Sequence, residues 1–137
     1  MINSRLAVAV HILALISSSE EQPMSSEIIA GSVNTNPVVI RRLTGLLRKA
    51  GLLKTQAGRT GAILTLKPED ITLLMVYRAV EPKEDLFMMH ESPNPNCPIG
   101  REIQGALETT FSRAQQALEA ELAAETLADV VHRLIPR

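Results

Sequence analysis

Hydrophobic residues in this 137-residue chain recur mostly at the spacing of amphipathic helices, and turn-forming residues divide them into segments. A first helix is predicted to begin after Asn3 or Ser4, either of which can cap it, and to end near Ile16. Its predicted buried face consists of Leu6, Val10, Leu13 and Ala14.

The next two helical segments outline a helix-turn-helix. A short helix is predicted over residues 25–33, with Ser25 or Ser26 as its cap, and a three-residue turn follows. Asn36 as N-cap and Pro37 at the first helical position start a second helix, which Gly51 ends. Its predicted buried positions are Val39 or Ile40, Leu43, Leu47 and Ala50. The positions left for solvent or a partner are Val38, Arg41, Arg42 and Arg48.

Two strand-like runs, LLKTQ at 52–56 and AILTL at 62–66, enclose the loop AGRTG with Arg59 at its tip. A basic hairpin directly after a recognition helix is typical of a wing, which places a cation in or beside the DNA minor groove. Helix, helix-turn-helix and basic hairpin together predict a winged-helix domain more specifically than any one of them does.

One more helix is predicted over residues 67–81, with Glu69 and Asp70 in its first turn. Ile71, Leu74, Met75 and Ala79 are the positions expected to pack on the domain core. Residues 82–98 contain four of the eight prolines and are therefore predicted to form an irregular connector.

The last long segment predicts an amphipathic helix of about 26 residues, or roughly 39 Å, which is longer than a winged-helix core requires. Its apolar positions recur every three or four residues: Ile99, Ile103, Leu107, Phe111, Ala114, Leu118 and Leu122. A symmetry mate is the simplest partner for this seam, so a homodimer is expected; docking within the chain is the alternative. Thr126 can cap a final short helix.

The predicted architecture is therefore mainly α with a small β-hairpin wing. It comprises a winged helix-turn-helix domain over residues 1–81, a connector over 82–98, and a dimerisation helix with a short C-terminal helix over 99–137. In the dimer, residues Ile103, Leu107, Phe111, Ala114 and Leu118 are expected at the interface.

Charge is distributed unevenly, although the net charge is only −1. Residues 1–67 carry eight Lys or Arg against three Asp or Glu, whereas residues 68–137 carry six against twelve. Between residues 28 and 68 the chain has seven cations and no acidic residue. This block predicts a surface that faces a polyanion, with chance clustering of charges as the alternative.

Composition narrows the remaining function classes. Aromatic residues make up 2% of the chain, which argues against a base-stacking RNA platform. The sequence has no Ser/His/Asp set, P-loop or metal motif, so neither an enzyme nor a cofactor is predicted. The apolar run 6–16 is too short to span a bilayer and a poor secretory signal, so a core helix and no membrane partner are expected. One cysteine fits a reducing, cytoplasmic compartment.

The stretches from "NTNPVVIRRLTGLLRKAGLLKTQ" to "MVYRAVE" and from "NCPIGREIQ" to "AAETLADV" resemble the Rrf-type family of winged-helix transcriptional regulators, which includes IscR, NsrR and CymR. The likeness covers nearly the whole chain in order. It implies operator-DNA binding as a homodimer, through the helix-turn-helix and wing, with a long dimerisation helix behind. The wing departs from many relatives, because Ala62 and Ile63 follow Gly61 where a second glycine and an aromatic residue are common.

Cys97 is the single cysteine and a candidate sensor. Cluster-binding members of the family carry three cysteines in this loop, so an iron–sulfur cluster is not expected here. With Pro98 at the first helical position, Cys97 would be the N-cap of the long helix, where a thiolate is stabilised. A reactive thiol that senses an oxidant and a structural turn residue are both open readings. A pocket for a small effector near this loop is a further alternative.

The leading hypothesis is thus a sequence-specific DNA-binding regulator, acting as a repressor on double-stranded operator DNA. The predicted DNA-contacting residues are Thr35, Asn36, Val38, Arg41, Arg42, Arg48, Lys54, Arg59 and Thr60. The alternative is a winged helix used for protein–protein assembly without DNA binding.

Overall fold

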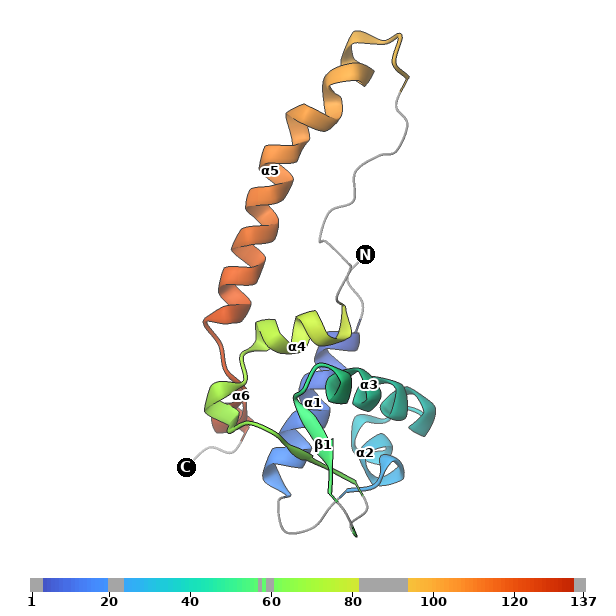
Figure 1. The fold of residues 1–137 in the computed structure, drawn as a ribbon, viewed down its shortest axis with the longest axis vertical. Coiled ribbons are helices and arrows are strands. Elements are labelled where there is room, and N and C mark those ends of the chain that lie inside the picture. The colour runs from blue at the N-terminus through green and yellow to red at the C-terminus, as the bar shows by residue number, and fades with distance from the viewer. Residues whose placement is uncertain (1–3, 20–23, 57, 59–60, 82–93, 135–137) are drawn as a thin grey trace.

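The computed structural model describes residues 4–19, 24–56, 58, 61–81 and 94–134. Most of its elements gather into a head, and one long helix projects from that head (Figure 1). In chain order the elements are α1 (Arg5–Ser18), α2 (Ser26–Val33), α3 (Pro37–Lys49), β1 (Leu53–Thr55), β2 (Ala62–Leu64), the 3-10 helix η1 (Pro68–Asp70), α4 (Leu73–Val80), α5 (Pro98–Ala123) and α6 (Leu127–Leu134). The mainly helical winged-helix fold is therefore confirmed.

Helix α1 forms the centre of the head. It contacts α2, α3, α4, α6 and β2, so it is surrounded on most of its circumference. Its buried residues are Ala9, Ile12, Leu13, Ala14 and Ile16. The predicted face was partly wrong, because Leu6 and Val10 are only half-buried and pack at the edge of the core. A helix that is apolar on nearly every side has no sequence period that fixes its orientation.

The helix-turn-helix follows its predicted caps. Ser25 Oγ accepts a hydrogen bond from the backbone N–H of Ile28 at 3.2 Å, and Asn36 Oδ1 accepts one from Val38 at 2.7 Å. Asn34 ends α2 in the left-handed conformation, with φ of 63°, which turns the chain toward α3. In α3 the buried residues are Ile40, Leu43 and Leu47. Ala50 was predicted to be buried but is exposed, because it lies at the C-cap beyond the last packed turn.

Gly51, with φ of 84°, leads from α3 into the hairpin. Strands β1 and β2 pair antiparallel, with Leu53 opposite Leu64 and Thr55 opposite Ala62. Leu53 of β1 and Ala62 of β2 are buried against the head, whereas Lys54, which follows Leu53 in β1, is exposed. The two predicted strands of the wing are thus present, and each is shorter than the strand-like run that predicted it.

The helix predicted over residues 67–81 is interrupted. Ile71 and Thr72 are extended between η1 and α4, so Glu69 and Asp70 lie in η1 instead of the first turn of α4. Two constraints cause the break. The Thr72 side chain caps α4 by accepting a hydrogen bond from the backbone N–H of Met75 at 3.2 Å. In addition, the extended segment pairs with the residues that follow α5: the Leu73 N–H donates to the Glu125 carbonyl at 2.9 Å.

The packing of α4 also differs in part from the prediction. Ile71 and Ala79 are buried as expected, together with Val76 and Val80. Leu74 and Met75 are only half-buried. Helix α4 starts at Leu73, five residues after η1 begins at Pro68. The buried positions of α4 therefore follow the period of a separate helix and do not continue the turn of η1.

Helix α5 projects from the head as an arm (Figure 1). Pro98 occupies its first turn and Cys97 its N-cap position, as predicted, although the Cys97 side chain makes no capping hydrogen bond. The lower part of α5 packs on α4, where the Arg78 guanidinium lies 2.8 Å from the Glu119 carboxylate. Hydrogen bonds from Arg78 and Gln115 hold the pKa of Glu119 below its ordinary value.

Helix α6 returns to the head. Thr126 caps it as predicted: its Oγ1 accepts from the Asp129 N–H at 3.1 Å, and the Thr126 N–H donates to Asp129 Oδ2 at 2.9 Å. Hydrogen bonds from the backbone N–H and the side chain of Thr126 to the Asp129 carboxylate hold the pKa of Asp129 below its ordinary value. Leu127 is fully buried and belongs to the same core cluster as α1. By its packing, α6 therefore belongs with the head, although the predicted division groups it with the dimerisation helix.

Replacing Leu127 by alanine tests this packing. We expect Leu127→Ala to lower the free energy of unfolding by about 2–5 kcal/mol, because it removes a fully buried side chain from the core. Leu134 in the same helix is 63% exposed, so Leu134→Ala should change it by no more than about 0.5 kcal/mol. Urea unfolding of both variants measures the difference; equal effects would show that α6 is not part of the head.

Candidate nucleic-acid interface

The outer ridge of α3 carries two of the predicted DNA-contacting residues, Val38 and Arg42. Val38 is 54% exposed, and Arg42, one turn later on the same side of the helix, is also exposed. Both lie roughly opposite the buried positions Ile40, Leu43 and Leu47, since the helical period separates the two sets. This ridge is thus free of the core and open to a groove of DNA.

A second side of α3 faces the wing across a cleft. The cleft has a volume of about 390 Å³ and lies between α2, α3 and the hairpin. Its polar lining consists of Ser25, Ser26, Arg41, Thr44, Arg48 and Thr55. Arg41, Thr44 and Arg48 are spaced three and four residues apart, which places them on one helical face. The structure therefore brings two of the predicted arginines together beside the wing.

Thr44 is the unusual member of this cleft. Its hydroxyl is buried and has no hydrogen-bond partner among the described residues. An unpaired buried hydroxyl costs free energy, and groups of this kind are uncommon in folded proteins. Thr44 was not among the residues predicted to contact DNA; its spacing from Arg41 and Arg48 was the available signal.

Arg41 also has a neighbour of opposite charge. Its guanidinium lies 3.4 Å from a carboxylate oxygen of Glu27 on α2, and both side chains are largely exposed. An exposed pair of this kind contributes little to stability and is readily exchanged for another anion. Glu27 directly precedes the acid-free block, so the ion pair marks the acidic border of the basic surface.

The remaining predicted contacts lie around these two faces. Asn36 is exposed and uses its side-chain oxygen for the α3 cap, whereas Thr35 is half-buried and donates its N–H to the Ala30 carbonyl at 3.0 Å. Lys54 is exposed on β1. Arg59 and Thr60 lie outside the described residues, between Gly58 and Gly61, whose positive φ values turn the hairpin.

Cys97 lies away from this surface, because α5 begins at the end of the arm farthest from the head (Figure 1). It is half-buried. Its turn is tight: a Cβ placed on Gly100 would come within 2.5 Å of the Asn94 carbonyl oxygen, and the Cys97 N–H donates to that same oxygen at 3.2 Å. The candidate sensor and the predicted DNA-contacting residues therefore do not share a site.

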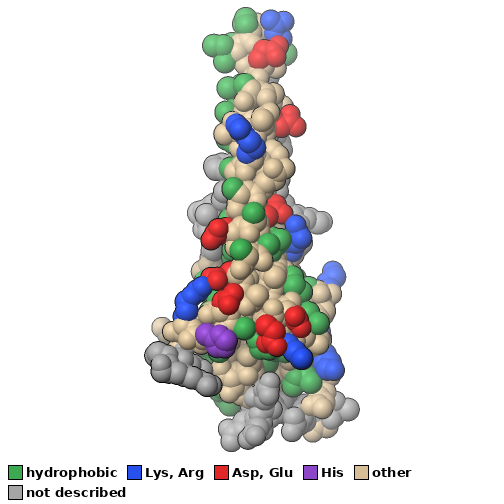
Figure 2. Space-filling model, turned by 90° about the vertical axis from the view of Figure 1, so that its left-hand side faces the viewer, with side chains coloured by type: hydrophobic (Ala, Val, Ile, Leu, Met, Phe, Trp, Pro, Cys, Tyr) green, Lys and Arg blue, Asp and Glu red, His purple; other side chains and the backbone are tan. Residues whose placement is uncertain are grey.

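The predicted dimer residues follow the arm. Within the single chain, no residue of α5 is buried, and Leu107 is 37% exposed. Figure 2 shows hydrophobic side chains along the length of the projecting helix. Ile103, Phe111, Ala114 and Leu118 are half-buried. Intrachain docking thus covers this seam incompletely.

The family model Rrf2, described as an iron-dependent transcriptional regulator, matches residues 2–133. The chain belongs to the Rrf2 family. The family resemblance is thereby confirmed, and the members of this Rrf2 family are transcriptional regulators. Among the described residues of this Rrf2 protein, no helix is both long and apolar enough to cross a membrane.

Individual relatives agree with the Rrf2 match. YwnA of Bacillus subtilis, named as an HTH-type transcriptional regulator, is 59% identical over 134 residues, which cover 98% of this chain and 99% of YwnA. A crystal structure described as that of a DNA-binding protein shares 54% identity and a TM-score of 0.78, covering 93% of this chain and 98% of that one. A transcriptional regulator from Lactobacillus plantarum has a TM-score of 0.82 at 26% identity, covering 97% of this chain and 91% of its own.

The iron in the Rrf2 description does not fit the donor atoms of this chain. An iron–sulfur cluster is held by three or four good ligands, mostly thiolates, and the full sequence contains one cysteine. The described residues contain no group of three or more His, Cys, Asp or Glu side chains placed to hold a metal ion.

Replacing Thr44 by valine tests the buried hydroxyl. We expect Thr44→Val to raise the free energy of unfolding by about 1 kcal/mol, because valine has a similar shape and removes the unpaired polar group. Urea unfolding gives the value, and the exposed Thr109→Val change on α5 is the matched control. A clear loss of stability in Thr44→Val would mean that the hydroxyl has a partner in the free protein.

Proposed function

We propose that this Rrf2-family protein is a sequence-specific DNA-binding repressor that acts as a cytoplasmic homodimer, without catalysis and without a metal cofactor. The observation that carries the proposal is the juxtaposition of Arg41 and Arg48 beside the wing, next to the exposed ridge of α3. No acidic residue occurs between residues 28 and 68, so the surface suits a phosphate backbone.

The two faces of α3 support different kinds of contact. The ridge with Val38 and Arg42 suits the major groove, where an apolar side chain can contact a thymine methyl group and a guanidinium can bind guanine. The cleft lined by Arg41 and Arg48 suits a phosphate, because it offers two cations on one face of α3. Binding there would require Arg41 to exchange Glu27 for the phosphate.

The hairpin would add contacts outside the major groove. Lys54 is exposed on β1, and Arg59 and Thr60 are predicted to contact the minor groove or its phosphates. Regulation through the loop at Cys97, by an oxidant or a small effector, stays a prediction.

A second copy of this chain is the partner that best fits the arm. The apolar seam of α5 is half-exposed in the single chain. Its residues are three or four positions apart, which is the spacing at which one helix packs along another. Two copies would present two α3 helices to a palindromic operator. One head alone contacts only a short stretch of DNA. Joining two heads in a dimer would therefore raise the affinity for the operator.

The DNA-binding proposal is tested by the salt dependence of binding. The protein is titrated onto the promoter region of its own gene and onto genomic fragments that it captures. We expect Arg48→Ala to reduce the slope of log K against log salt concentration by about 1.8 for the dimer, because one phosphate contact is lost from each of its two heads. Arg113→Ala, which removes an exposed arginine from α5, is the control and should leave the slope unchanged.

These titrations also separate DNA binding from a protein-assembly role. A winged helix that serves only in assembly would bind the captured fragments no better than unrelated DNA. Equal slopes for Arg48→Ala and the parent chain would contradict the placement of a phosphate in the cleft.

Substitutions in α5 test the homodimer. We expect Leu107→Glu to convert a dimer into a monomer, because it would bury a carboxylate in the apolar seam. Operator affinity should fall on the order of a hundredfold, since the two heads would then bind separately. Thr109→Glu, on the opposite side of α5, should stay dimeric. Sedimentation gives the masses; a parent chain that sediments as a monomer would overturn the proposed assembly.

A further inference from the structure

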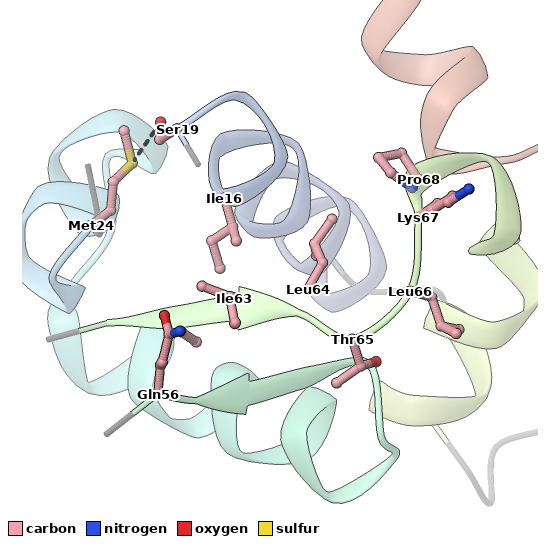
Figure 3. Close-up of a pocket in the computed structure, with 11 residues that line it drawn as sticks. Ile16, Ser19, Met24, Gln56, Ile63, Leu64, Thr65, Leu66, Lys67 and Pro68 are labelled. Carbon is pink, nitrogen blue, oxygen red and sulfur yellow. Dashed lines mark hydrogen bonds between the residues drawn. The ribbon is translucent and has the colours of Figure 1, made fainter. Parts of the chain in front are cut away.

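A hollow of about 500 Å³ lies between the C-terminal end of α1 and the wing (Figure 3). Ile16 of α1 and Ile63 of β2 both line it, and Met24 and Leu64 add further apolar surface. This volume is in the range of pockets that hold small organic ligands. Most of its lining is hydrophobic, so it suits an apolar group better than a phosphate.

Of the described residues that line the hollow, one is charged. Lys67 is exposed there, and its ammonium forms no ion pair or hydrogen bond with the described residues. Among the described residues, no acidic side chain lines the hollow. The nearby hydroxyls are engaged within the protein, because Ser19 donates to Met24 Sδ at 3.7 Å and Thr65 donates to the Gly51 carbonyl. An anion at the rim would therefore find one available cation.

The hollow shares a wall with the DNA-facing cleft. Ile16, Met24 and Ala62 line both spaces. Met24 directly precedes Ser25, which caps α2, and Ala62 is the first residue of β2. A molecule that pushes against this wall would shift the wing relative to α2 and α3. The flexible thioether of Met24 makes the wall adaptable.

We propose that this hollow is an effector site that binds a small organic carboxylate with an apolar body, and that its occupancy weakens DNA binding. The apolar body lies between Ile16 and Ile63, and the carboxylate lies at Lys67. Occupancy displaces the wing from the position that lines the cleft with Arg41 and Arg48. The regulatory half of this inference rests on the proposed DNA binding, whereas the binding site does not.

Binding is tested first, without DNA, by NMR of the full chain with ¹³C-labelled methionine methyl groups. The probe is decanoate, kept below the concentration at which it forms micelles, and 1-decanol is the uncharged comparison. The Met24 signal, identified by its loss in Met24→Leu, should shift in a saturable manner. Met75 on α4 does not line the hollow and serves as the internal control. An unmoved Met24 signal, or equal shifts at both residues, would overturn the site.

Two variants then separate the charge from the apolar body. Lys67→Met should weaken decanoate about two- to fivefold, as expected for an exposed ion pair, and leave 1-decanol unchanged. Lys49→Met, which removes an exposed cation at the end of α3, should change neither affinity. Ile63→Trp should weaken both probes at least about tenfold by filling the hollow. If Ile63→Trp fails to fold, the Lys67 and Lys49 comparison still decides whether an anion binds here.

DNA binding is measured last, on fragments that the parent chain captures. Decanoate should weaken operator binding by the parent chain and by Cys97→Ser alike, and should have less effect on Lys67→Met. If decanoate shifts Met24 but leaves operator affinity unchanged, the regulatory half is wrong. If the chain binds no DNA at all, the proposed function fails, while the NMR result still stands for or against the site.

Discussion

The burial of α1 is the interaction on which the rest of the structure depends. Ile12 and Leu13 are fully buried at the point where α2, α3, α4, α6 and β2 meet around this helix. The helix-turn-helix and the wing scarcely form a core by themselves, since α2 and the strands are short. Their relative positions are therefore set by the helix that they share, and so is the cleft between α3 and the hairpin.

Local signals in the sequence predicted the parts of the fold that local chemistry controls. Ser25, Asn36 and Thr126 cap their helices as expected, because a cap depends on residues within one turn. The orientation of α1 was not predictable in the same way, since its residues are apolar on nearly every side. The break before α4 depends on pairing between Thr72 and Thr126, which lie 54 residues apart in the sequence. Contacts of that separation leave no local pattern.

The residues of the candidate site also fall into two groups, those that local sequence patterns predicted and those that depend on contacts in the folded head. Charge patterning identified Arg41, Arg42, Arg48 and Lys54, and all four are exposed on or beside α3. It did not identify Thr44 or Glu27, whose importance comes from burial and from the approach of α2 to α3. The hollow beside Lys67 was also beyond sequence analysis, because residues from α1, β2 and the segment before α2 meet only in the folded head. The alternative effector pocket that the sequence suggests lies near Cys97 instead.

The junction between the arm and the head has a mechanical consequence. Leu73 donates to the Glu125 carbonyl and Leu127 donates to the Ile71 carbonyl, so the chain on both sides of this junction is fixed to the base of the head. The arm behaves as a lever about 39 Å long. A tilt of roughly 5° at the base moves its far end by about 3.4 Å, which is the rise of one base pair along a DNA strand. In the proposed homodimer, the backbone pairing at residues 71–73 and 125–127 would thus set how accurately the two heads are spaced.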